Sequence, residues 1–152
     1  MQKKMTQGVD IKKDYDRIIF SSSFRRLQNK TQVFPLPGSV FVHNRLTHSL
    51  EVSSVGRSLG DLVGKHILKT YESELTDESK RFYRNHLKGV LASACLCHDI
   101  GNPAFGHSGE DAIVSFFKKK QSMLEPKFKP TEYADLLNFI GNANSFEFLH
   151  NN

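Results

Sequence analysis

Residues 45–68, RLTHSLEVSSVGRSLGDLVGKHIL, decide the fold class. Apolar residues return there at helical spacing and form a broad stripe over about six turns. The stripe contains Leu46, Leu50, Val52, Val55, Leu59, Leu62, Val63 and Leu68, together with His48 and His66. The segment predicts one long helix that buries this stripe, with His48 among the buried residues.

The rest of the chain shows further helical patterns and no strong strand signal, so we expect an all-α fold. Residues 30–44 form a loop or a small hairpin around Pro35, Pro37 and Gly38, and residues 70–78 form a polar connection. Pro126 and Pro130 bracket a linker. Helices are expected over residues 10–29 (with an interruption at Ser21–Ser23), 79–98, from 107 or 108 to 118–120, and 132 to about 140, where Gly141 ends the helix before an amphipathic tail.

Length and composition limit the class of protein. The 152 residues are enough for one domain, and 38% of them are hydrophobic. No apolar run approaches the length of a membrane span, and no apolar stretch follows the N-terminal lysines as a secretory signal requires. Cys95 and Cys97 make no disulfide framework and are expected in the core, so we expect a cytoplasmic protein.

The charge favours an anionic partner without proving one. Lys and Arg outnumber Asp and Glu by 21 to 16, which gives a formal net charge of +5. A positive surface suits a nucleotide, a nucleic acid or phosphate. A mildly basic protein with no anionic partner is the alternative.

Two histidines and an aspartate suggest a metal site. His48 lies on the long helix, and His98 and Asp99 lie where a later helix breaks at DIGNP, residues 99–103. A lone histidine on an apolar face is more often a hydrogen-bonded core residue. Two imidazoles and a carboxylate together suit a first-row transition metal.

Several segments resemble one known family. RLTHSLEV at 45–52 and CLCHDIGNPAFGHSGEDAI at 95–113 closely resemble the deoxyguanosine triphosphate triphosphohydrolases of the HD-domain superfamily. FRRLQNKTQVF at 24–34 and FIGNANSF at 139–146 resemble further segments of the same family. The resemblance implies an α-helical HD core and the metal-dependent hydrolysis of a deoxynucleoside triphosphate to deoxynucleoside and inorganic triphosphate. It also implies a homo-oligomer.

The resemblance assigns His48, His98 and Asp99 as ligands of a divalent metal ion, which is Mn, Mg, Co, Fe, Ni or Zn. A fourth ligand of the family, a distal aspartate, has no match, because neither Asp111 nor Asp135 stands in the matching context. We therefore expect residues 1–152 to be the N-terminal part of an HD-type phosphohydrolase domain, incomplete at its C-terminal side. Such a chain should have little activity alone.

His107 and Glu110 match the family's catalytic pair. They lie three residues apart at a helix start and so share a face. Glu110 can then orient the imidazole while His107 acts as general base or general acid toward the water or the leaving group. For Glu110 alone, the alternative is an ordinary first-turn acid favoured by the helix dipole.

Three residues are candidates for substrate binding or for support of the site. Arg45 matches an arginine that contacts substrate phosphate in the wider superfamily, and its alternative is a solvated residue at a helix start. Gln32 resembles a position that helps recognise the nucleoside. Asn102 can support the metal ligands from behind, or it can simply end the helix.

Two other classes of function stay open. One is a different HD nucleotide phosphodiesterase, which keeps the metal but releases another product. The other is a non-catalytic module that binds nucleotides or single-stranded nucleic acid through its positive charge. The pair His107 and Glu110 favours an enzyme, because binding alone does not need it.

Overall fold

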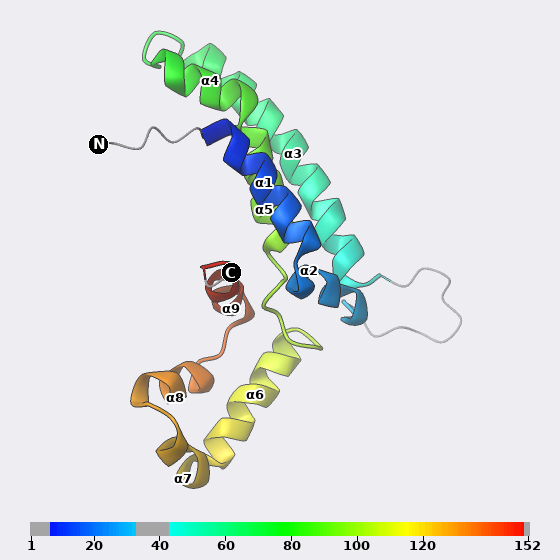
Figure 1. Ribbon diagram of the computed structural model, residues 1–152, viewed down its shortest axis with the longest axis vertical. Helices are drawn as coiled ribbons and strands as arrows, with labels where there is room; N and C mark the ends of the chain where they lie inside the picture. The colour runs from blue at the N-terminus through cyan, green and yellow to red at the C-terminus, as the bar shows by residue number, and fades with distance from the viewer. Residues whose placement is uncertain (1–6, 33–42, 151–152) are drawn as a thin grey trace. The chain divides into compact units, whose positions relative to one another are not determined.

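The described part of the protein is mainly helical. The computed structural model describes residues 7–32 and 43–150, with the side chains of 11–32 and 43–146. Within these ranges there is no strand, and an isolated antiparallel bridge joins Thr31 to Asn44, so the predicted all-α class is confirmed. The α-helices (Figure 1) are α1 Gln7–Phe20, α2 Ser22–Arg26, α3 Arg45–Thr70, α4 Asp77–Asn85, α5 Leu87–Cys97, α6 His107–Lys119, α7 Gln121–Leu124, α8 Pro130–Leu137 and α9 Gly141–His150.

Two compact units make up this part of the chain. The first contains the described residues up to Arg25 together with Leu46–His98, and the second contains Arg26–Arg45 and Asp99 onward as far as they are described. The chain passes from one unit to the other between Arg25 and Arg26, between Arg45 and Leu46, and again between His98 and Asp99. No helix in the described residues is both long enough and apolar enough to cross a bilayer.

Ser21 interrupts the first predicted helix, as the sequence suggested. Its hydroxyl donates to the carbonyl of Ile18 at 2.8 Å and accepts from the backbone N–H of Phe24 at 3.1 Å. One side chain therefore satisfies a backbone group at the end of α1 and another at the start of α2.

The long helix is confirmed as α3, but its predicted buried face is wrong. The buried positions are small or polar: Arg45, Ser49, Ser53, Gly56, Gly60 and Gly64. Much of the apolar stripe is exposed, with Val55 59% and Leu62 63% exposed, and His48 is only partly buried.

The reason is a close approach of helices in the first unit. A Cβ on Gly56 would lie 2.6 Å from Sγ of Cys95, and one on Gly60 would lie 2.7 Å from Cα of Lys88. Only glycine allows the backbones to come this near. Ser53 completes the contact, because its hydroxyl donates to the carbonyl of Ala92 at 2.8 Å. The small face of α3 thus packs on α5.

The helix predicted over 79–98 is two helices, which is a second correction. Thr76 caps α4 by accepting the N–H of Ser79 at 3.2 Å, so this helix begins two residues earlier than expected. The chain turns at His86, whose N–H donates to Phe82 while its carbonyl accepts from Val90. The residue therefore ends one helix and starts the next. Downstream, α5 packs against α1, and Cys97 is buried as predicted while Cys95 is partly buried.

In the second unit, α6 confirms the helix expected from His107, and it packs against α8. Tyr133 of α8 is 2% exposed and donates its hydroxyl to the carbonyl of Phe117 at 2.7 Å. The short helix α7 precedes the linker bracketed by Pro126 and Pro130, and a 3₁₀ turn, Glu125–Lys127, overlaps the start of that linker.

Gly141 begins α9, whereas the sequence predicted that it would end a helix. The preceding helix α8 already stops at Leu137. A Cβ on Gly141 would collide with Oδ1 of Asn102. A close packing contact therefore explains why residue 141 is a glycine, and helix termination does not explain it.

The ends of the predicted loop or hairpin at 30–44 pair with each other. The N–H of Arg45 donates to the carbonyl of Lys30 at 2.9 Å, and the N–H of Gln32 donates to His43 at 3.5 Å. The two prolines and Gly38 lie outside the described residues.

Candidate active site

The histidine pair lies in the first unit, where α3 and α5 pack. His48 sits in the first turn of α3, and His98 follows the last residue of α5. Their rings meet edge to face with centroids 5.3 Å apart. One ring nitrogen of each lies within 4.8 Å of the other, which suits two ligands of one cation.

A backbone contact orients the ring of His98. Its Nδ1 lies 2.7 Å from the carbonyl oxygen of Cys95, one turn earlier. Because a carbonyl can only accept a hydrogen bond, Nδ1 carries the proton in the neutral ring. The lone pair then resides on Nε2, which is the form that binds a metal.

Asp99 is the residue after His98 and belongs to the second unit. Its side chain is nearly buried and pairs with Arg45, whose Nη1 lies 2.9 Å from Oδ2. Asn102 donates its side-chain N–H to Oδ1 at 2.5 Å. A buried carboxylate requires such partners, and Arg45 and Asn102 supply them to Asp99.

Arg45 is itself buried, with 7% of its surface exposed. The alternative of a solvated residue at a helix start is therefore wrong. Its Nη2 would lie 3.0 Å from a Cβ on Gly106, so the guanidinium extends from the start of α3 to the loop before α6. A phosphate contact for Arg45 stays a prediction. The same holds for nucleoside recognition by Gln32, whose backbone pairs with His43.

The loop after Asp99 is anchored by α9. The N–H of Gly101 donates to Oγ of Ser145 at 2.7 Å, and the side chain of Asn144 donates to the carbonyl of Gly101 at 2.9 Å. A Cβ on Gly101 would collide with the backbone of Ser145. The GNANS segment at 141–145 thus fixes the loop that carries Asn102. Asn102 also forms the turn that the sequence predicted, because its N–H donates to the carbonyl of Asp99 at 3.2 Å.

Two consecutive residues with positive φ lead into α6. Phe105 has φ of 67° and Gly106 has φ of 56°. A non-glycine residue pays a steric cost in this region. The turn brings His107 to the first position of α6, where its side chain is 99% exposed.

His107, Glu110 and Gly141 form a chain of hydrogen bonds. Nδ1 of His107 lies 2.7 Å from Oε2 of Glu110, and Oε1 of Glu110 accepts the N–H of Gly141 at 2.7 Å. The hydrogen bond from the N–H of Gly141 lowers the pKa of Glu110 below its usual value, and the hydrogen bond with His107 lowers it further. An ionised Glu110 accepts the proton on Nδ1, which leaves Nε2 of His107 to exchange protons with a bound molecule.

Lys30 is a site residue that sequence reasoning missed. Its Nζ donates to the carbonyl of Asn102 at 2.6 Å, across 72 residues of chain. Burial lowers the pKa of Lys30, and the nearby charges of Arg45 and Arg26 lower it further. The available signal was its place as the first residue of the expected loop or hairpin, in a segment that resembles the family.

Comparison with known proteins identifies the relatives. The family described as "HD domain" matches residues 45–142. A "Deoxyguanosinetriphosphate triphosphohydrolase-like protein" of Synechocystis sp. is 48% identical over 140 residues, and one of Pseudomonas aeruginosa is 50% identical over 139. Each alignment covers 90% of this chain and 30% of the relative. A "Deoxyguanosinetriphosphate triphosphohydrolase" of Yersinia pestis is 45% identical over 109 residues, which are 70% of this chain and 21% of the relative.

Proposed function

Because the chain belongs to the HD domain family, we propose that it serves metal-dependent hydrolysis of a deoxynucleoside triphosphate to deoxynucleoside and inorganic triphosphate. The observation that carries this proposal is the hydrogen-bonded chain His107–Glu110–Gly141. A protein that only binds a ligand does not need a histidine oriented by an anchored carboxylate, whereas proton transfer does. The names of the relatives support the choice of substrate.

The residues present fit a divalent metal. His48 and His98 offer two imidazole nitrogens within 4.8 Å, and the contact with Cys95 leaves the lone pair of His98 on Nε2. Asp99, the next residue, adds a carboxylate that is paired with Arg45. We propose these three as ligands, and the imidazole and carboxylate set does not distinguish Mn, Mg, Co, Fe, Ni or Zn. A bound cation would supply Lewis-acid polarisation of a phosphate oxygen.

The second unit supplies the proton chemistry. Water attacks the α-phosphorus, and Nε2 of His107 takes its proton while the bond from phosphorus to the 5′ oxygen breaks. That oxygen takes a proton from the solvent and leaves as the deoxynucleoside alcohol, the three phosphates leave together, and His107 returns its proton to the solvent. The ionised carboxylate of Glu110 stabilises the positive charge on the imidazole meanwhile.

The surroundings suit a triphosphate. The first N–H groups of α6 follow Gly106 and can donate to phosphate oxygens. Arg45 and Lys30 add positive charge in the same unit. We propose Arg45 as a phosphate contact and as a support of Asp99, and Gln32 as a contact to the nucleoside. Asn102 supports Asp99 from behind.

We further propose that the protein acts in the cytoplasm as a homo-oligomer. The exposed apolar stripe of α3, which includes Val55, Leu59 and Leu62, supports self-association. Light scattering of the purified chain at several concentrations tests it, and a monomer at every concentration would contradict it.

A single-turnover assay tests the reaction, because it detects even slow chemistry. The chain is held in excess over dGTP with Mn²⁺, and the products are separated by ion exchange. We expect deoxyguanosine and triphosphate. His107→Ala should lower the rate by about two to four orders of magnitude and leave nucleotide binding unchanged. His66→Ala, an exposed histidine of α3, is the matched control.

The products decide between the classes of function. Release of dGMP and pyrophosphate would show a phosphodiesterase-like reaction and contradict the proposal. Salt-sensitive binding of dGTP or single-stranded DNA without any hydrolysis would show a non-catalytic module.

A further inference from the structure

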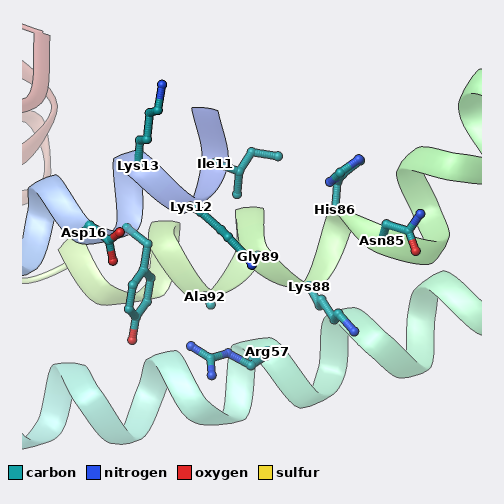
Figure 2. A pocket seen from close by; sticks show the side chains of 11 residues that line it. Ile11, Lys12, Lys13, Asp16, Arg57, Asn85, His86, Lys88, Gly89 and Ala92 are labelled. Carbon is teal, nitrogen blue, oxygen red and sulfur yellow. The ribbon is translucent and has the colours of Figure 1, made fainter. Parts of the chain in front are cut away.

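A cavity lies within the first unit, apart from the residues assigned to the candidate active site. It has a volume of about 780 Å³ and is bounded by α1, α3, α5 and the end of α4 (Figure 2). Small-molecule sites in proteins commonly enclose about 300–1,000 Å³. The space is therefore of the size that one small ligand occupies.

The rim of this cavity is strongly cationic. Four cationic side chains line it, Lys12, Lys13, Arg57 and Lys88, against one carboxylate, Asp16. In the described part of the chain, the first three form no salt bridge, and Lys88 approaches Asp61 only to 3.8 Å. Cations gathered around one hollow without neutralising partners favour an anionic ligand.

The floor of the cavity is apolar. Ile11 and Gly89 lie there with Ala92, which is 1% exposed. A Cβ on Gly89 would lie 3.0 Å from Cγ2 of Ile11, so the absence of a side chain keeps this part of the floor open.

Arg57 adds a flat surface. Its guanidinium lies over the ring of Tyr15, 5.4 Å from the ring centroid. A guanidinium placed this way can stack on a planar ring and donate to an anion at its edge. In Figure 2, Lys12 of α1 and Arg57 of α3 both extend into the space between the helices.

We propose that this cavity binds a small phosphorylated ligand with a planar ring, of the nucleotide class. The phosphates contact Lys12 and Arg57, and the ring lies on the apolar floor beside Gly89. A bare phosphate would leave that floor unused. A nucleic-acid strand follows an extended groove with successive stacking residues, whereas this hollow is a single site. The proposal needs no metal and does not rest on the proposed reaction.

Binding is measured on the 152-residue chain in EDTA, with dGTP, inorganic triphosphate and deoxyguanosine as separate probes. Backbone amide NMR shifts locate the site. We expect dGTP to shift the amides of residues 11–16 and 86–92, and to bind more tightly than either of the other probes. The double variant Lys12→Gln, Arg57→Gln should weaken this binding about tenfold or more. In that variant, the amide shift changes that dGTP causes near His107 should be the same as in the unchanged chain.

The control removes the same number of cations from the same two helices. Arg17→Gln, Lys69→Gln alters α1 and α3 outside the cavity and should leave binding unchanged. An equal loss in both double variants would reduce the effect to net charge and overturn the proposal. So would equal affinity for inorganic triphosphate and dGTP, tighter binding of a thymidine oligonucleotide at the same residues, or no shifts at α1 and α5.

Discussion

Arg45 and Asp99 form a buried ion pair in the second unit, with side chains 8% and 7% exposed and the charged atoms 2.9 Å apart. Such a pair adds little stability compared with apolar residues, but losing one partner leaves a buried charge uncompensated. Arg45 therefore stabilises the buried carboxylate of Asp99, in addition to any contact with substrate.

We predict that Arg45→Met destabilises the chain by about 3–5 kcal/mol, because Asp99 then keeps a buried charge with one fewer partner. The double variant Arg45→Met, Asp99→Asn should recover part of the loss. Urea unfolding of the unchanged chain, Arg45→Met, Asp99→Asn and the double variant gives the coupling free energy. A coupling near zero would mean that the pair does not hold the site together.

Protonation of Glu110 should lower the stability of the folded chain at acid pH. The pKa of Glu110 is lowered in the folded chain, first by the N–H of Gly141. The stabilisation is therefore fully present above the unfolded pKa of about 4.3 and is lost as the pH falls through the lower folded value. An NMR titration of the Glu110 carboxyl carbon and the Gly141 amide should show one shared midpoint below pH 4.3. A midpoint at or above that value would contradict the anchored carboxylate.

The sequence predicts the contacts of the site between residues close together in the chain, and it does not predict the contacts between residues far apart in the chain. The spacing of His107 and Glu110 predicts their shared face, and the structure has them hydrogen-bonded. The contact of Glu110 with Gly141 spans 31 residues, and that of Lys30 with Asn102 spans 72. Spacing along the chain carries no information about such pairs.

At the scale of elements, α3 shows which part of a helix a hydropathy pattern can predict. The period of 3.6 identified the helix correctly, with its start at Arg45. The hydropathy pattern predicted the wrong buried face of α3, because serine and glycine count as polar or neutral. Their small size nevertheless permits the closest helix packing. The division at His86 was missed because no proline or capping residue marks it.

Gly60→Ala tests this packing. The new Cβ would lie 2.7 Å from Cα of Lys88, so we expect a loss of about 1–3 kcal/mol in the free energy of unfolding. Ser58→Ala on the exposed side of the same helix is the control, and it should change stability by less than about 0.5 kcal/mol. Thermal or urea unfolding compares them. A stabilising Gly60→Ala, as helix propensity alone predicts, would show that α3 and α5 do not pack this closely.

Metal binding should raise the free energy of unfolding of the entire chain. The proposed ligands belong to a folded arrangement that the unfolded chain lacks, so a bound cation favours the folded state. At a free Mn²⁺ or Co²⁺ concentration about 100 times the dissociation constant, the gain should be about 2.7 kcal/mol. Calorimetry with the metal and then with EDTA measures it.

The variants for this measurement separate the site from other histidines. His98→Ala should abolish the rise in melting temperature, because it removes one of the two imidazoles. His66→Ala should retain it. A rise of equal size in both variants would place the cation elsewhere.

The anchoring of Glu110 by Gly141 also has a consequence for synthesis of the chain. Glu110 leaves the peptidyl-transfer centre 31 residues before its second partner, which at about 5–20 residues per second is a delay of about two to six seconds. A nascent chain therefore displays the whole HDIGNPAFGHSGE segment before the carboxylate can be anchored. The order of translation thus delays assembly of the proposed proton-transfer pair until α9 has begun to emerge.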